Sequence, residues 1–435
     1  MNKKLITSFS SISESISDDE FFCDLLPFAT RFFIFTDIGM TCKLVACLAE
    51  SLKCHSFAES FPQSLDELLS TMIEYSAYTD NTRLIDAFAS LVDELDGDKR
   101  EAIVMFFFSL LERDELSVEF SLLMLASIYD RLSDEQKQTF IEAVESNAKS
   151  ECPYIRKSSY NAASMIKHSL DFDFQAEEDP FVQVSMLKCI STPLPVDFII
   201  NSCSWNVQIA YIRRFKDPSG FIDKSESPYV LIEALKHYDD VSENITRVLS
   251  ENTDLISDEL IDYFCRVADN TEFIEILLDK GCIPCAKACL SYGKSLIKKS
   301  AEILGASVNW EDRLFLINHI SKNIDILGEF LLQLLDDKAC LVRFSCVPIL
   351  ADYALTMGPR WVRNRLVTRC NTMLLNSDYR FKMTVCQLIG NLALRCPPQF
   401  IDTNFFPITN AILHNIKPPV KQYYDDIMKQ ILSHQ

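Results

Sequence analysis

The stretch Asp336-Asp-Lys-Ala-Cys-Leu-Val-Arg343 contains the pattern that decides the fold of this chain. A polar turn is followed by an apolar residue and a long cation, and an apolar run comes next. The pattern recurs in three further stretches, Glu151-Cys-Pro-Tyr-Ile-Arg156, Asn376-Ser-Asp-Tyr-Arg-Phe-Lys382 and Ile416-Lys-Pro-Pro-Val-Lys421. The last three cations stand 39 and 39 residues apart. A fixed period near forty residues, with no strand signal between copies, predicts a stack of antiparallel helix pairs.

The apolar residues of the C-terminal third lie at helical spacing. One such stripe consists of Phe381, Val385, Leu388, Ile389 and Leu392. Stripes of this kind indicate helices that each bury one face. The predicted fold class is therefore all-α, a HEAT-repeat or armadillo-type α-solenoid whose antiparallel helix pairs stack in a curved array. We expect it to cover residues 1–435 as a single domain. A solenoid has no enclosed active site, so its function should reside in its turns and its concave ridge.

The spacing of the turns divides the chain into three parts. Residues 1–214 are predicted to form N-terminal repeats, 215–300 irregular middle repeats and 301–435 C-terminal repeats. The cations of the first part, or the residues that replace them, step by 36 to 40 residues through Lys43, Arg83, Glu119 and Arg156.

The middle of the chain is harder to phase. Shorter intervals lead to Phe181–Gln183 and Trp205–Gln208, which predicts trimmed or fused repeats. Pro218, Gly220 and Pro228 then predict a long loop, with helices resuming near Tyr229.

Composition narrows the classes of partner. The chain carries 62 acidic and 42 basic residues, for a formal charge of −20. Such a surface repels phosphate backbones and anionic lipids, so we expect no nucleic-acid or membrane partner. The longest apolar run, Ala102 to Leu111, is about half of a membrane span. Sixteen Cys residues are scattered without a disulfide framework, and the first ten residues have no signal-peptide pattern, so we expect a reduced cytosolic or nuclear protein.

No residue pattern predicts catalysis. Cys282-Ile-Pro-Cys285 has redox-motif spacing, but no strand precedes it, and we interpret these residues as buried thiols. His237 and His319 are isolated in the sequence, so a zinc site would lack its remaining ligands. The 9 Gly residues, where average usage gives about 30, provide no phosphate-binding loop. We therefore predict no catalytic residue, cofactor or metal, and a binding scaffold in place of an enzyme.

Several turns resemble those of one known family. The stretches are Leu25-Leu-Pro-Phe-Ala29, Tyr129-Asp-Arg-Leu-Ser133, Pro153-Tyr-Ile-Arg-Lys157, Ser204-Trp-Asn-Val-Gln208, Asn309-Trp-Glu-Asp-Arg313 and Gly358-Pro-Arg-Trp361. In their order along the chain they are similar to the turns of the scaffold (A) subunit of protein phosphatase 2A. This chain is shorter than the usual member of that family. The resemblance therefore implies that several repeats are lost, between residues 157 and 310.

The resemblance implies two protein partners. N-terminal repeats would hold a regulatory subunit through Pro153, Arg156, Lys157 and Trp205. C-terminal repeats would hold the phosphatase catalytic subunit through Trp310, Glu311, Tyr379 and Arg380. Trp310 and Tyr379 should then lie on turns within repeats and be partly exposed on one edge. The alternative function is a HEAT-repeat adaptor, similar to transport receptors, with an unrelated protein client.

The turn cations and Trp310 also have structural interpretations that involve no partner. The cations could form a ladder with carboxylates of the neighbouring turn, which would offset the unfavourable helix dipole. Trp310 could pack against an adjacent turn. The chain also departs from the family, since Asn206, Gln208 and Glu311 replace arginines and Glu119 occupies an expected basic position.

Overall fold

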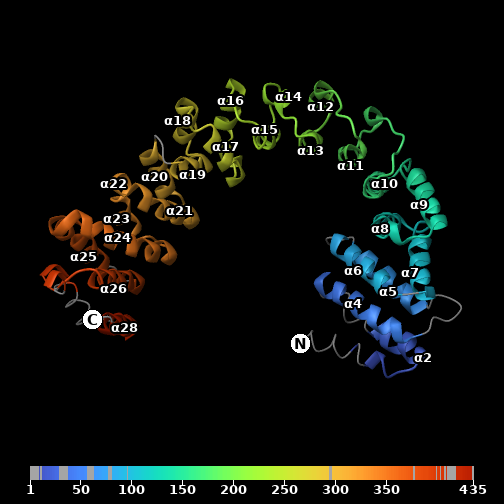
Figure 1. Cartoon of the computed structure of the whole chain (residues 1–435), viewed down its shortest axis with the longest axis horizontal. Coiled ribbons are helices and arrows are strands. Elements are labelled where there is room, and N and C mark those ends of the chain that lie inside the picture. Colours follow the sequence, from blue (N-terminus) through green and yellow to red (C-terminus); the bar gives the residue numbers. More distant parts are fainter. Residues whose placement is uncertain are drawn as a thin grey trace. The chain divides into compact units, whose positions relative to one another are not determined.

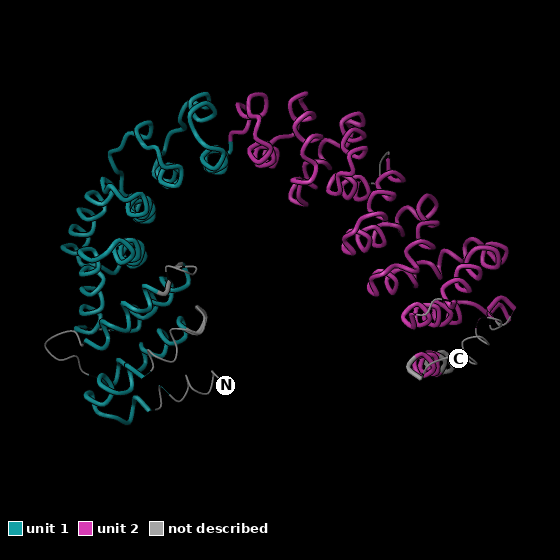
Figure 2. Tube along the Cα trace, turned by 180° about the vertical axis from the view of Figure 1, so that it is seen from behind, with its two compact units in different colours: residues 1–216 teal, residues 217–435 magenta. Residues whose placement is uncertain are grey.

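A computed structural model describes most of the chain (Figure 1). The described residues are 9, 12–28, 38–55, 63–76, 81–95, 97–292, 296–375, 378–397, 399–401, 403–405, 408 and 418–433. Of the stretches quoted above, Ala29, Asn376, Ser377, Ile416 and Lys417 lie outside these ranges. Every regular element in the described ranges is a helix, which confirms the predicted all-α fold. The chain forms two compact units, residues 1–216 and 217–435, which are described separately (Figure 2).

Unit 1 consists of helix pairs that follow one another in two rows. Its elements are α2 (Asp18–Glu20), η1 (Phe21–Leu25), α4 (Ile38–Cys54), α5 (Gln63–Ser76), α6 (Asn81–Glu94), α7 (Gly97–Leu110), α8 (Glu115–Ser127), η2 (Tyr129–Arg131), α9 (Asp134–Asn147), α10 (Pro153–Ile166), η3 (Phe174–Ala176), α11 (Pro180–Cys189), α12 (Val196–Ser202) and α13 (Trp205–Phe215). Helices α4, α6, α8, α10, α11 and α13 contact one another in that order, and we call them the inner helices of unit 1. The elements between them are the outer helices (Figure 1).

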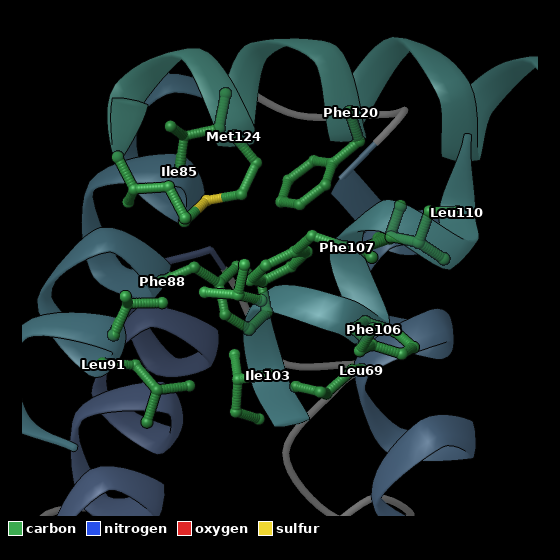
Figure 3. Close-up of a cluster of buried hydrophobic side chains, with 14 of the residues drawn as sticks. Leu69, Ile85, Phe88, Leu91, Ile103, Phe106, Phe107, Leu110, Phe120 and Met124 are labelled. Atoms are coloured by element: carbon green, nitrogen blue, oxygen red, sulfur yellow. The ribbon is translucent and has the colours of Figure 1, made fainter. Parts of the chain in front are cut away.

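The core of unit 1 shows how an outer helix joins two inner ones. Phe107 of α7 packs edge-on against Phe88 of α6, with ring centroids 5.6 Å apart. Phe120 of α8 meets Phe88 in the same manner at 5.7 Å (Figure 3). Such aromatic pairs contribute about 0.5–1.5 kcal/mol each beyond the apolar area that they bury. Three consecutive helices therefore share one aromatic cluster, as expected for stacked repeats.

The last three inner helices of unit 1 confirm the prediction of trimmed repeats. They begin at Pro153, Pro180 and Trp205, so successive starts are 27 and 25 residues apart. The outer elements between them shrink to the single turn of η3 and the seven residues of α12. A short outer helix leaves the inner row intact, because the inner helices still contact one another directly.

Unit 2 repeats the same arrangement. Its elements are α14 (Ser219–Ile222), α15 (Pro228–Leu235), α16 (Glu243–Glu251), η4 (Thr253–Leu255), η5 (Asp258–Leu260), α17 (Ile261–Arg266), α18 (Thr271–Asp279), α19 (Ile283–Tyr292), α20 (Ile297–Ala306), α21 (Trp310–Ile320), η6 (Ser321–Asn323), α22 (Ile324–Leu327), α23 (Phe330–Leu334), α24 (Cys340–Trp361), η7 (Val362–Leu366), α25 (Val367–Leu374), α26 (Tyr379–Ala393) and α28 (Pro418–Ser433). Helices α17, α19, α21, α24, α26 and α28 contact one another in order, and together with α15 they are its inner helices.

The long loop predicted around Pro218 and Gly220 is wrong. Helix α14 occupies this segment and buries Phe221 and Ile222, and α15 begins at Pro228, as the resumption near Tyr229 predicted. Both prolines stand at helix starts, where the missing N–H costs no hydrogen bond. The middle region therefore contains short repeats where the sequence indicated a loop.

One segment of unit 2 is apolar and long enough to cross a membrane by composition alone, namely residues Cys340–Leu374. Its backbone is not one continuous helix, because Gly358 has φ +80°. Val342, Cys346, Val347 and Leu350 are buried in the core of unit 2. Packing inside the protein accounts for the apolar face of this segment.

Candidate functional site: the starts of the inner helices

A recurrent turn leads into the inner helices. In five of these turns, the side chain two residues before the N-cap accepts a hydrogen bond from the N-cap backbone N–H. The pairs are Cys152 N with Ser150 Oγ (3.2 Å), Asp179 N with Glu177 Oε1 (2.9 Å), Ser227 N with Ser225 Oγ (3.3 Å), Asn309 N with Ser307 Oγ (3.2 Å) and Ala339 N with Asp337 Oδ1 (2.8 Å). The side chain thus bends the chain sharply immediately before the helix.

The long cation of the sequence pattern is the fourth residue of the inner helix, and where it is an arginine it closes this turn. Arg156 Nη1 donates to the carbonyl oxygens of Ser150 and Glu151, both at 2.9 Å. Arg313 Nη1 donates in the same way to the carbonyls of Ser307 and Val308, at 2.5 and 3.1 Å. Arg343 Nη1 donates to those of Asp337 and Lys338, at 2.6 and 3.0 Å. The guanidinium therefore satisfies carbonyls that the turn leaves without a backbone partner.

Glutamine takes the same position where the repeats are short. Gln183 Nε2 donates to the carbonyl of Glu177 at 2.6 Å, and Gln208 Nε2 to that of Cys203 at 3.0 Å. Replacement of arginine by Gln208 therefore preserves the turn and removes the charge. These positions therefore share a side chain that donates hydrogen bonds to the turn carbonyls, and that side chain need not be charged.

Arg156 in unit 1 and Arg313 in unit 2 form the pairs expected of the predicted ladder of cations and carboxylates. Arg156 forms a bidentate pair with Glu177 at 2.9 Å, and Arg313 forms one with Asp337, at 2.5 and 2.9 Å. Each carboxylate belongs to the turn of the following repeat. These hydrogen bonds raise the pKa of both guanidinium groups. Each pair therefore joins two successive repeats.

Arg343 departs from the ladder. Its side chain is 1% exposed, Nε donates to Thr384 Oγ1 at 3.0 Å, and the guanidinium lies 5.1 Å from the Phe381 ring centroid. A hydroxyl and an aromatic face of α26 thus take the place of the carboxylate.

The predicted equivalence of the N-terminal cations is wrong. Lys382 and Lys421 are fourth in α26 and α28, like Arg156 in α10. Lys43, Arg83 and Glu119 are instead the sixth, third and fifth residues of α4, α6 and α8. A similar interval along the chain therefore did not mean the same position in a turn.

Aromatic side chains stand exposed at the first or second position of six inner helices. In unit 1 they are Tyr154 (64% exposed), Phe181 (64%) and Trp205 (47%), and in unit 2 they are Tyr229 (47%), Trp310 (38%) and Tyr379 (48%). We call these six residues the aromatic ridge. Trp310 and Tyr379 begin α21 and α26 directly after their N-caps, Asn309 and Asp378. Their predicted place at a turn and their partial exposure are confirmed, and their place on one edge of the solenoid stays a prediction.

Three ridge residues were missed by the sequence analysis. Tyr154, Phe181 and Tyr229 each follow a proline that is the first residue of its helix. The dipeptide of proline and an aromatic residue recurs at 153, 180 and 228 and could have revealed them. Because proline fixes the helix start, the next side chain lies at its outermost turn.

The other predicted binding residues surround the ridge. Pro153 is the first residue of α10, and Lys157 Nζ lies 4.0 Å from Glu119 Oε1. Glu311 is exposed beside Trp310, and the exposed Arg380 lies 3.4 Å from Asp378. The hydrogen bonds of Arg156 are made within the chain, so this residue holds its turn in place.

The thiols of the Cys282-Ile-Pro-Cys285 motif are buried, as predicted. Burial raises the pKa of Cys282 to about 12. A hydrogen bond with Cys289, together with burial, raises the pKa of Cys285 strongly. Both are thus protonated at neutral pH, and a protonated thiol is a poor nucleophile. The described residues contain no group of three or more His, Cys, Asp or Glu side chains placed to hold a metal.

Helix pairs stacked through recurrent turns define the chain as an all-α HEAT-repeat solenoid. No model of a known protein family matches the sequence, and no curated protein matches it. Similar solved structures include Kap121p bound to Ste12p, with a TM-score of 0.34 and 13% identity over 93% of this chain and 45% of that chain. Kap121p bound to RanGTP has a TM-score of 0.35 and 12% identity over 99% and 48%. An engineered protein has a TM-score of 0.22 and 16% identity over 93% and 98%.

The chain thus spans about half the length of these karyopherin chains. The resemblance to the phosphatase scaffold subunit stays a prediction, because no family model and no curated protein matches the chain.

Proposed function

We propose that this protein is a non-catalytic adaptor of the cytosol or nucleus that holds protein partners on the aromatic ridge. The observation that carries the proposal is the exposure of six large aromatic side chains at equivalent positions of inner helices. Burial within the fold does not explain them, because 38% to 64% of each side chain remains accessible. Tyr and Trp are the residues most often found as energetic anchors of protein interfaces.

The turns give the ridge a fixed shape. Arg156, Arg313 and Arg343 each tie the segment before the helix to the helix itself. Their guanidinium groups also reach the next repeat, so neighbouring anchors keep their spacing. A surface ordered before binding loses less conformational entropy when the partner arrives.

A finer form of the proposal assigns the partners. In it, Trp310, Glu311, Tyr379 and Arg380 of unit 2 hold a serine/threonine phosphatase catalytic subunit. Pro153, Lys157 and Trp205 of unit 1, with Arg156 supporting their turn, hold a regulatory subunit. Its support is the exposed start of α21 and α26 at the residues that the sequence resemblance implied. The alternative is a transport-receptor-like adaptor for an unrelated client, which would use the same anchors.

Affinity purification of the full-length chain from its native cells tests these proposals. Trp205→Ala and Trp310→Ala should each remove a partner that the unaltered chain retains. Met105→Ala and Leu394→Ala truncate side chains that are 51% and 53% exposed but lie outside the ridge, so they should retain every partner. Recovery of a phosphatase catalytic chain that depends on Trp310 supports the scaffold, and recovery of transport components supports the alternative. If no partner depends on the ridge, the adaptor proposal is refuted.

A further inference from the structure

The first observation is a groove between two inner helices of unit 1. It has a volume of about 590 Å³ and lies between α11 and α13. Two ridge residues, Phe181 and Trp205, stand at its sides where the helices begin. Val184, Ile209 and Ala210 continue the apolar lining and are half-buried. The groove can therefore receive apolar side chains from outside the protein.

The second observation is the charge at the other end of this groove. Lys188, Arg213 and Arg214 line it in the last turns of α11 and α13. Cations are favourable near helix C-termini, which accounts for their position along the helices. It does not account for the exposed aromatic residues at the opposite end. The combination of an apolar start and a basic end, in a chain of net charge −20, distinguishes this groove from the surrounding surface.

Two cations of the groove, Lys188 and Arg214, form no ion pair within the part of the chain that the structure describes. The hydrogen-bond acceptor of Lys188 Nζ is the amide oxygen of Asn161, at 2.8 Å. Although its side chain is exposed, partial desolvation and then repulsion from Lys157 lower the pKa of Lys188. Arg214 donates to the backbone carbonyl of Ile190 at 3.4 Å. A carboxylate placed here would relieve the repulsion between the two lysines and gain charge-assisted hydrogen bonds.

Resting on the proposed adaptor function, we propose that this groove binds an extended peptide segment of a partner protein, with an apolar anchor beside Phe181 and Trp205 and acidic residues beside Lys188 and Arg214. The spacing of the two features follows from helix geometry. Trp205 and Arg214 are nine residues apart on α13, which is about 14 Å along a helix. An extended chain covers that length in about four residues. The bound segment is therefore a short apolar and acidic motif.

A peptide is a better fit than a nucleic acid strand. The lining is mostly apolar, whereas a strand would need cations along its whole backbone. The net charge of −20 also repels a polyanion at long range, while a short acidic motif carries few charges.

The test is fluorescence polarisation with the full-length chain and labelled synthetic peptides. One probe carries two aromatic residues separated by about four residues from three glutamates, and a second has the reverse order. In a third probe, lysines replace the glutamates. We expect one of the acidic probes to bind, with an affinity that falls as salt concentration rises, and the lysine probe to bind at least about tenfold more weakly.

Variants locate the binding. Trp205→Ala should weaken binding of the acidic probe by about tenfold or more, whereas Met105→Ala, which truncates an exposed side chain outside the ridge and the groove, should leave that binding unchanged. Lys188→Glu should weaken it similarly, whereas Lys149→Glu changes an exposed lysine elsewhere in unit 1 and should have little effect. Circular dichroism confirms that each variant is folded.

Equal binding of acidic and lysine probes, binding that survives Trp205→Ala or Lys188→Glu, or displacement by a single-stranded oligonucleotide would each overturn the proposal. These results leave the adaptor function standing if purified partners still depend on the ridge. If no purified partner depends on the ridge but the acidic probe still binds at the groove, only the adaptor function is refuted.

Discussion

Replacement of Arg343 by methionine should destabilise unit 2 by about 2–4 kcal/mol. Methionine keeps most of the apolar stem but removes the donors to Asp337 O, Lys338 O and Thr384 Oγ1. Hydrogen bonds to a charged group contribute about 1.5–3 kcal/mol each, and part of that sum is offset because the variant no longer desolvates a cation. The net loss should exceed that of Arg156→Met, since the Arg156 side chain is 21% exposed and water can replace its bonds.

Urea unfolding followed by circular dichroism measures the difference, and hydrogen exchange locates it. Because each repeat contacts only its neighbours, exchange should accelerate in α23, α24 and α26 and remain unchanged in unit 1. Arg343→Lys is the matched control for charge: it keeps the cation but not the planar set of donors, and we expect an intermediate loss. An Arg343→Met chain with unaltered unfolding, or one that is more stable than Arg156→Met, would show that the turn bonds do not stabilise the repeat.

Four further outcomes are expected. Tyr379→Ala should weaken binding of a unit 2 partner at least about tenfold while the melting temperature changes little. Glu311→Arg should tighten binding to an ordinary phosphatase catalytic subunit. Titration calorimetry measures both affinities, and weaker binding by the Glu311→Arg chain would contradict the second prediction. Alkylation at pH 8 should spare Cys282, because its pKa of about 12 keeps the thiol protonated at that pH. Labelling should become complete once the chain is unfolded. Rapid labelling of Cys282 in the folded chain, measured by mass spectrometry, would contradict its burial. Gly390→Ala should destabilise the contact of α26 with α28 by about 1–3 kcal/mol, because the added Cβ would lie 2.5 Å from Ile427 Cγ2. Ile427→Ala in the same chain should restore part of the lost stability. Limited proteolysis at α28 measures both effects.

The sequence predicted those parts of the structure that follow from period and polarity. Regular apolar stripes indicated the helix pairs, and the resemblance to the phosphatase scaffold placed Trp310 and Tyr379 on turns within repeats. Prolines misled the prediction around residue 218, because a proline that begins a helix and one that interrupts a chain look alike without knowledge of what is buried. Phe221 and Ile222, both buried, were the residues that distinguished the two cases.

The role of the cations could be predicted only in part. The unfavourable helix dipole suggested a carboxylate of the neighbouring turn as the partner of each cation, and for Arg313 that partner is Asp337. The bonds from Arg313 to its own turn could not be inferred, because they depend on how the backbone directs two carbonyls toward one guanidinium. For the same reason, Lys43 and Arg83 were grouped with Arg156 on interval alone.

The ladder also determines which repeats can be exchanged with one another. The donor of one repeat and its acceptor in the next must be inherited together, since Arg156 needs Glu177 and Arg313 needs Asp337. Gln208 finds its acceptors in and before its own turn, at Cys203 and Ile200, so the repeat that contains it makes no such demand on its neighbour. Duplication, deletion or transplantation of repeats should therefore be tolerated most readily around α13, and least at the junctions that follow α10 and α21.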